Sequence, residues 1–153
     1  MDKPRIGYVG LGVMGGALAR RLLREHKLTV FDLSAERRAE FAALGATVVD
    51  SPAAVGAASD IVLTCLPTSK QVKDVIFGGN DGLIRGLRAG GIIVDQTSGA
   101  TAVTRAMAAD LAASGIELID GPVSGGPRGA DAGTIAIMVG GTDAQYALVA
   151  PIL

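Results

Sequence analysis

Short hydrophobic runs alternate with amphipathic segments along most of the chain. The runs are rich in β-branched residues, and their apolar side chains stand at consecutive positions rather than at every second one. Continuous apolar runs of this length are typical of parallel strands that helices cover on both faces. The predicted strands are residues 5–9, 29–31, 46–49, 61–65, 92–95, 117–119 and 134–139.

The segments between these runs have the spacing of helices with one apolar face. Met14, Leu18 and Leu22 recur at every fourth position, which places them on the same side of a helix. Ser34 and Ser51 each precede a predicted helix, where a hydroxyl can accept from a free backbone N–H. Regular strand–helix alternation predicts one α/β domain over residues 1–153, a doubly wound and mostly parallel sheet. Later helices are expected to begin at Ser69, at Thr97 or Ser98, and at Thr142 or Asp143, the last of them covering residues 144–153.

A glycine-rich turn joins the first predicted strand to the first predicted helix. Residues 10–15 read Gly-Leu-Gly-Val-Met-Gly, the G-x-G-x-x-G pattern in the strand–turn–helix context of dinucleotide-binding folds. Gly10 permits the tight turn, Gly12 lets the backbone approach a pyrophosphate, and Gly15 lets the helix pack close to the strand. The free N–H groups and positive dipole end of the helix then attract the anion. The chain is therefore expected to be a Rossmann-type domain.

An acidic residue ends the second predicted strand. Asp32 lies 20 residues after Gly12, where a carboxylate accepts hydrogen bonds from the adenosine ribose of NAD and repels the 2′-phosphate of NADP. We therefore expect NAD, with NADP second to it. Arg37 and Arg38 would soften this preference if they faced the ribose, but a solvated helix face is the simpler interpretation. An S-adenosylmethionine-dependent enzyme is an alternative, although its loop usually reads G-x-G-x-G and Met14 occupies the last of those positions.

Polar and turn-forming residues follow the fourth and fifth predicted strands. Residues 64–67 read Thr-Cys-Leu-Pro, and residues 95–98 read Asp-Gln-Thr-Ser. Ligands of open parallel sheets bind beyond the carboxyl ends of the strands, so both segments should border the cofactor cleft. Thr97 and Ser98 keep two interpretations, a contact with the ligand and a cap of the next helix.

The least generic stretch lies near the end of the sequence. Residues 120–130 read Asp-Gly-Pro-Val-Ser-Gly-Gly-Pro-Arg-Gly-Ala. The Ser124 hydroxyl and the backbone N–H groups of Gly125 and Gly126 would form a small donor-rich nest that suits a carboxylate. An irregular turn without a ligand is the alternative.

Taken from end to end, the chain resembles the β-hydroxyacid dehydrogenase family, which includes 3-hydroxyisobutyrate dehydrogenase and, more distantly, 6-phosphogluconate dehydrogenase. The resemblance implies hydride transfer between NAD and the β-hydroxyl of a small hydroxy acid of the 3-hydroxyisobutyrate, tartronate semialdehyde/glycerate or L-threonate type. Two departures are minor: Gly121 stands where the family has Ala, and Thr97 and Ser98 exchange order. The matching segments are residues 6–15, 26–32, 64–67, 95–98 and 120–126.

The resemblance also implies roles for individual residues. The family's general acid/base is a lysine in an all-helical second domain, in a G-x-G-x-x-x-x-x-x-K-x-x-N pattern that this sequence does not contain. We therefore expect cofactor binding with little or no turnover from this chain alone; a non-catalytic NAD-binding or assembly module is the alternative. By resemblance, Leu11, Gly12, Val13 and Met14 cradle the pyrophosphate, and Gly10 and Gly15 complete this cofactor-binding turn. Asp32 holds the ribose, Leu66, Pro67 and Thr97 line the path from the adenine to the nicotinamide, and Ser124, Gly125 and Gly126 bind the carboxylate or hydroxyl of the substrate.

Charge and composition exclude several other classes of protein and indicate where this chain is located. A net charge of −1 provides no basic field for nucleic acid or an anionic membrane, and no metal site is expected. The uncharged run at residues 6–19 imitates a signal peptide, but it is too short to span a bilayer and its glycine spacing favours the nucleotide loop. The single cysteine, Cys65, cannot form an internal disulfide, which favours a cytoplasmic location. With 49% hydrophobic residues, the chain is expected to expose an apolar patch and form a homo-oligomer.

Overall fold

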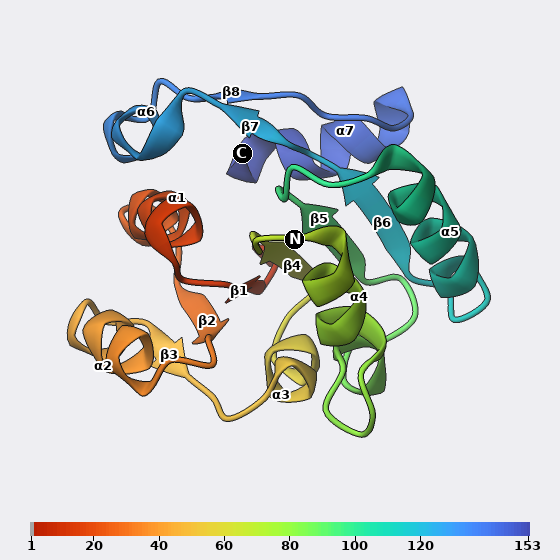
Figure 1. Cartoon of the computed structure of the whole chain (residues 1–153), viewed down its shortest axis with the longest axis horizontal. Coiled ribbons are helices and arrows are strands. Elements are labelled where there is room, and N and C mark those ends of the chain that lie inside the picture. Colours follow the sequence, from red (N-terminus) through yellow and green to blue (C-terminus); the bar gives the residue numbers. More distant parts are fainter. Residues whose placement is uncertain (1) are drawn as a thin grey trace.

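The computed structural model describes residues 2–153 and places a six-stranded sheet between two layers of helices (Figure 1). All neighbouring strands of this sheet are parallel, in the order β3-β2-β1-β4-β5-β6. The direction of strand addition reverses between β1 and β4, which is where α/β sheets bind ligands. The predicted doubly wound, Rossmann-type sheet is thus confirmed. Its strands are β1 (Ile6–Val9), β2 (Leu28–Phe31), β3 (Thr47–Val48), β4 (Ile61–Thr64), β5 (Ile92–Asp95) and β6 (Glu117–Asp120).

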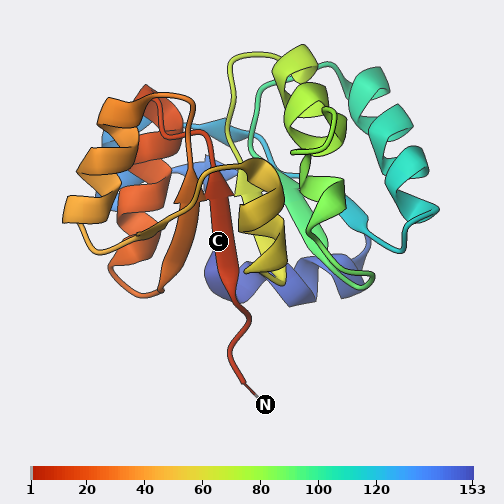
Figure 2. The ribbon, with the colours of Figure 1, turned by 90° about the horizontal axis from the view of Figure 1, so that it is seen from below.

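Helices cover both faces of the sheet and divide the core into two layers. Tyr8 and Leu63 point to one layer, with α1, α2, α6 and α7, whereas Val62 and Ile93 point to the other, with α3, α4 and α5. Figure 2 shows α3 and α4 in front of the sheet and α7 behind it. Among residues 2–153, no helix has the length and apolar character needed to cross a membrane. The helices are α1 (Val13–Leu23), α2 (Ala35–Ala43), α3 (Pro52–Ala57), α4 (Ser69–Phe77), α5 (Thr101–Ala112), α6 (Gly126–Ala132) and α7 (Asp143–Val149), with 3₁₀ turns η1 (Leu83–Arg85) and η2 (Ala150–Ile152).

The prediction of a strand over residues 134–139 in the main sheet is wrong. Only β8 (Ala136–Ile137) is extended there, and it pairs antiparallel with β7 (Val123–Ser124) in a separate two-stranded sheet. The chain enters β7 only two residues after β6 ends. A further parallel strand would need a crossover of a dozen or more residues back to the amino edge of the sheet, but most of the residues between β6 and residue 134 belong to β7 and α6. Instead α6 packs against α1 and turns the chain back beside β7.

Hydroxyl side chains begin several helices. Ser34, Ser51 and Thr142 cap α2, α3 and α7 as predicted, each accepting from a backbone N–H three residues later. The cap of α4 is Thr68 rather than the predicted Ser69, because Thr68 has extended backbone angles (φ −144°, ψ 160°) and Ser69 is already helical. The sequence therefore locates this helix start with an error of one residue.

Two further helix boundaries differ from the expectation. Helix α5 begins at Thr101 without any side-chain cap, so neither Thr97 nor Ser98 caps it. The last helix ends at Val149, and Pro151 lies in the 3₁₀ turn that follows. Proline lacks the N–H that a continuing α-helix needs, which explains the change of geometry.

Candidate functional site

The carboxyl ends of the strands around the reversal point border a cleft of about 590 Å³, a volume within the range of small-molecule sites. Its floor is formed by the ends of β1 and β2, with Gly10 and Asp32 among the lining residues. Leu66 and Pro67 close one side after β4, and α4 closes the far side. Residues predicted for cofactor binding thus come together from three separate segments.

The three glycines of the turn occupy three different environments. Gly10 has φ +100°, and a Cβ atom there would overlap the carbonyl oxygen of Cys65. A Cβ atom on Gly15 would overlap the carbonyl oxygen of Gly10. A Cβ atom on Gly12 would meet nothing within 4 Å. Two glycines therefore allow close packing of backbone, and the third leaves open space above the start of α1.

The start of α1 offers N–H groups to that space. Gly12 is the N-terminal boundary residue and supplies no side-chain cap. The first amide bonded back into the helix is that of Gly16, which donates to the Gly12 carbonyl at 2.7 Å. The N–H groups of Val13 and Met14 precede it, in the first turn, where no intrahelical acceptor exists. Val13 is 69% exposed, so this end of the helix is accessible to an anion.

Two backbone amides hold the carboxylate of Asp32. Oδ2 accepts from the N–H of Leu11 at 2.7 Å, and Oδ1 accepts from the N–H of Ser34 at 2.8 Å. Leu11 itself is fully buried, so it contributes to the site by orienting Asp32. The carboxylate is therefore fixed at the mouth of the cleft, while each oxygen keeps a second lone pair for a ligand hydroxyl.

The interpretation of Arg38 as part of a solvated face needs correction. Its Nη1 donates to the carbonyl oxygens of Asp32 (2.7 Å) and Leu33 (3.0 Å), and its guanidinium lies 5.9 Å from the centre of the Phe31 ring. Arg37 instead pairs with Glu40 at 3.1 Å. Arg38 thus stabilises the backbone turn after β2 by donating to two of its carbonyl oxygens, and it does not bond to the Asp32 carboxylate.

Thr97 joins the ends of β4 and β5. Its Oγ1 accepts from the N–H of Leu66 at 3.0 Å. Its own N–H donates to Oδ1 of Asp95, which also accepts from the hydroxyl of Thr64 at 2.9 Å. Asp95 is 2% exposed, and burial raises its pKa above the ordinary value of 3.8, because the charged form is poorly solvated there. The sequence pattern included Asp95 but assigned it no role; the structure makes it the anchor of the Leu66 turn.

The serine–glycine loop follows β6 on the far side of β5. Its first residue, Gly121, donates its N–H to the Asp95 carbonyl at 2.8 Å. Ser124, Gly125 and Gly126 are exposed, and the two glycines have φ +133° and +67°, which L-amino acids rarely adopt. These three residues do not line the 590 Å³ cleft, so a ligand that reached both regions would have to extend across the end of the sheet.

Helix α1 holds this loop in place. Helix α6 packs along it, and Arg20 pairs with Asp131 of α6 and with Glu40 of α2, both at 3.4 Å. The guanidinium of Arg21 lies directly over Gly133, where a Cβ atom would come within 2.7 Å of it. The two predicted binding loops are therefore attached to the same helix.

Comparisons with known proteins agree with this geometry. The family model for the NAD-binding domain of 6-phosphogluconate dehydrogenase matches residues 5–153. The chain belongs to this family. The 2-(hydroxymethyl)glutarate dehydrogenase of Eubacterium barkeri is 41% identical over 150 residues, which are 97% of this chain and 50% of that protein. The chain thus spans about half the length of the curated relatives it matches.

Two solved structures have the same fold as this chain. The 3-hydroxyisobutyrate dehydrogenase of Mycobacterium tuberculosis with L-serine is 30% identical, with a TM-score of 0.90 over 99% of this chain and 51% of that one. Psf3 in complex with NADP⁺ and 2-OPP is 32% identical, with a TM-score of 0.91 over 96% and 52%. The chain is an NAD(P)-binding domain of the 3-hydroxyisobutyrate dehydrogenase type, and the resemblance seen in the sequence is confirmed.

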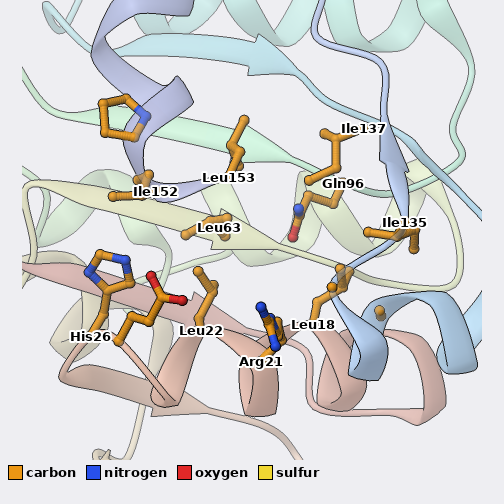
Figure 3. A pocket seen from close by; sticks show the side chains of 14 residues that line it. Leu18, Arg21, Leu22, His26, Leu63, Gln96, Ile135, Ile137, Ile152 and Leu153 are labelled. Carbon is orange, nitrogen blue, oxygen red and sulfur yellow. The ribbon is translucent and has the colours of Figure 1, made fainter.

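A second cavity of this dehydrogenase-type domain borders the later turns of α1, away from the glycine turn at the start of that helix. It measures about 170 Å³, and Figure 3 shows Leu18, Leu63, Ile135 and Leu153 around it. Gln96 also lines it and accepts the hydroxyl hydrogen of buried Tyr8 at 2.7 Å. None of the predicted cofactor or substrate residues borders this cavity, so the 590 Å³ cleft remains the candidate cofactor site.

Proposed function

We propose that this chain is the cofactor-binding part of an NAD-dependent 3-hydroxyacid dehydrogenase. The single observation that carries the proposal is the open space over Gly12 at the uncapped start of α1. A pyrophosphate in that space accepts from the N–H groups of Val13 and Met14 and lies at the positive end of the helix dipole. Gly10 and Gly15 give the turn its shape, and Leu11 orients Asp32.

The adenosine half of NAD fits the 590 Å³ cleft, with its ribose at Asp32. Two backbone N–H groups fix the Asp32 carboxylate, so it accepts from ribose hydroxyls and cannot readily move away from a 2′-phosphate. This favours NAD over NADP. The path from the ribose toward the nicotinamide end is lined by the turn at Leu66 and Pro67 and by Thr97, whose hydroxyl accepts from the Leu66 N–H.

When bound, NAD accepts a hydride from the β-carbon of the hydroxy acid. In this proposal Ser124, Gly125 and Gly126 bind the carboxylate of that acid by donating hydrogen bonds to it. Removal of the hydroxyl proton needs a positioned base, and the lysine pattern of the resembling family is absent from these 153 residues. The polypeptide by itself is therefore expected to bind cofactor and to turn over little or no substrate.

Two broader properties follow from the same proposal. Met138, Tyr146 and Leu148 are each more than half exposed, which favours self-association into a homo-oligomer. Cys65 is a free thiol, in keeping with a reducing, cytoplasmic compartment. Sedimentation over a range of concentrations tests the first, and imaging of the tagged protein in its source cells tests the second.

Calorimetric titration with NAD, NADP and S-adenosylmethionine tests the cofactor assignment. We expect NAD to bind most tightly, NADP more weakly and S-adenosylmethionine not at all. Binding of S-adenosylmethionine alone would replace the dehydrogenase proposal by its competitor, and equal affinity for NADP would remove the role given to Asp32. Turnover assays with 3-hydroxyisobutyrate, L-threonate and glycerate complete the test, since near-full activity would contradict the missing-lysine argument.

A further inference from the structure

Four carboxylates line the candidate adenosine cleft, and they come from three separate parts of the chain. Asp32 follows β2, Asp50 follows β3, and Asp74 and Asp81 belong to α4 and the loop after it. Within residues 2–153, the only ion pair made by any of them joins Asp74 to Lys70 at 2.9 Å. Among the described residues, Asp32, Asp50 and Asp81 have no ion-pair partner, and the only groups that donate to the Asp32 carboxylate are two backbone N–H groups.

Positive charge is absent from the lining of this cleft, as far as the structure describes the chain. The two arginines after β2 are both bonded: Arg37 pairs with Glu40, and Nη1 of Arg38 donates to the backbone carbonyls of Asp32 and Leu33 beside the Phe31 ring. A phosphate attached to the ribose would thus meet carboxylates in a lining that contains no guanidinium or ammonium group.

The walls between these charges are apolar. Leu33 is 90% exposed at the lip of the cleft, and Leu66, Pro67 and Val75 line it from β4 and α4. Side chains of this kind suit the two faces of a planar base. They also form low-dielectric walls, which concentrate the field of the surrounding carboxylates inside the cleft.

We propose that Asp50 and Asp81 act together with Asp32 as a distributed electrostatic filter, which admits adenosine with free ribose hydroxyls and rejects adenosine bearing a 2′-phosphate. The inference rests on the proposed cofactor function and deepens it, because selectivity against NADP is then shared by three segments. Replacing Asp32 alone leaves the other two charges in place, so that single change does not complete a switch to NADP.

Coulomb's law gives the size of the effect. One carboxylate on the order of 10 Å from a phosphate dianion in water lowers its affinity by roughly fourfold at low ionic strength. Physiological salt, with a Debye length of about 8 Å, reduces that factor to less than about twofold. Removing both Asp50 and Asp81 should therefore change NADP affinity strongly at low salt and weakly at high salt, a pattern that a lost hydrogen bond does not produce.

The test compares the ratio of NADP to NAD affinity, measured calorimetrically, in five proteins. These are the wild type, Asp32→Asn, the double variant Asp50→Asn/Asp81→Asn, the triple variant that combines all three changes, and the charge-matched control Asp110→Asn/Glu25→Gln. Asp110 and Glu25 are exposed and do not line the cleft. Each protein is titrated at about 10 mM and about 150 mM salt, which changes the Debye length severalfold. Asparagine keeps the size of the side chain, and a melting curve verifies that each variant folds.

The filter predicts that the double variant raises the ratio by about tenfold at low salt and by about twofold at high salt, relative to the control. It also predicts a further gain, at least as large, when Asp32→Asn is added. The filter is overturned if the double variant has the same NADP-to-NAD affinity ratio as the control, or if its gain in that ratio does not depend on salt concentration. In either case, binding of NAD by the wild type still supports the proposed function. Failure of the wild type to bind either dinucleotide overturns the proposed function itself.

Discussion

Substitution of Gly12 by alanine separates cofactor binding from folding more cleanly than any other change in the turn. The backbone at Gly12 has φ −68° and ψ −162°, an extended conformation that alanine adopts without strain. The added methyl group meets no protein atom within 4 Å. It enters the space that the proposed pyrophosphate occupies, so the variant should fold normally and fail to bind.

The expected effect on stability is small because two terms oppose each other. Alanine at a helix N-terminal boundary is less favourable than glycine by about 0.5–1 kcal/mol. Replacing glycine also restricts the unfolded chain, which stabilises the fold by about 0.4–1 kcal/mol. The net change is within about 1 kcal/mol, which for a domain of this size shifts Tm by less than about 4 °C.

The expected effect on affinity is large. A methyl group between the phosphate and the helix start causes overpacking worth about 1–3 kcal/mol and weakens charge-assisted hydrogen bonds worth about 1.5–3 kcal/mol each. NAD affinity should therefore fall by at least about 100-fold. Calorimetric titration measures this loss, and a thermal melt measures stability in parallel.

Two other glycines provide the comparison. Gly129→Ala is the control, because its Cβ atom meets only ordinary contacts, the nearest at 3.6 Å from Ile135, so NAD affinity should stay at the wild-type value. Gly15→Ala places a Cβ atom on the Gly10 carbonyl oxygen and should lower stability by about 3 kcal/mol or more. Wild-type NAD affinity in Gly12→Ala would refute the assignment of the pyrophosphate to this turn, and unfolding of the variant at room temperature would refute the claim that alanine fits there without strain.

Three further predictions concern buried groups. The hydroxyl of Ser59 is buried without a hydrogen-bond partner among the described residues. Ser59→Ala should therefore raise the free energy of unfolding, measured by urea denaturation, by about 1 kcal/mol. Ser51→Ala should lower it by about as much, because the cap of α3 is lost. Burial raises the pKa of the Cys65 thiol to about 11 from 9.0, so Ellman's reagent at about pH 8 should label the folded protein at least about 100-fold more slowly than the protein in urea; equal rates would contradict this. Burial likewise raises the pKa of Asp95 above 3.8, so its stabilising contribution is complete below that value and is lost as pH rises through the folded-state pKa. Asp95→Asn, which keeps an acceptor for Thr64, should therefore flatten the rise in stability that is expected as pH falls toward 3.8, and an unchanged slope would exclude the buried charge as its cause.

The sequence predicted most of the main sheet and the candidate cofactor turn because both depend on short-range signals. A run of β-branched residues forms a strand wherever helices cover it, and all six strands of the main sheet lie within or next to predicted ones. The roles of Gly10 and Gly15 follow from close backbone packing that only glycine allows, and the role of Gly12 follows from the open space that its missing side chain leaves. Their spacing therefore carries the information without any knowledge of distant contacts.

Contacts between distant segments could not be predicted in the same way. A threonine before a helix suggests a cap, yet Thr97 bonds to the amide of Leu66, 31 residues away. Asp50 and Asp81 look like ordinary solvated loop residues until folding brings them to one cleft with Asp32. The direction of β8 depends on how α6 packs, which no local pattern specifies.

Helix α1 explains why the two predicted binding loops can act together. Its first turn faces the proposed pyrophosphate. On its later turns, Arg20 pairs with Asp131 of α6 and Arg21 lies over Gly133, which follows α6. Helix α6 begins directly after Ser124 and Gly125. Helix α1 therefore fixes the position of that loop as well as the position of the glycine turn. A dinucleotide seated on the start of α1 would therefore have a fixed distance to the loop, which is the requirement for hydride transfer between a bound cofactor and a bound acid.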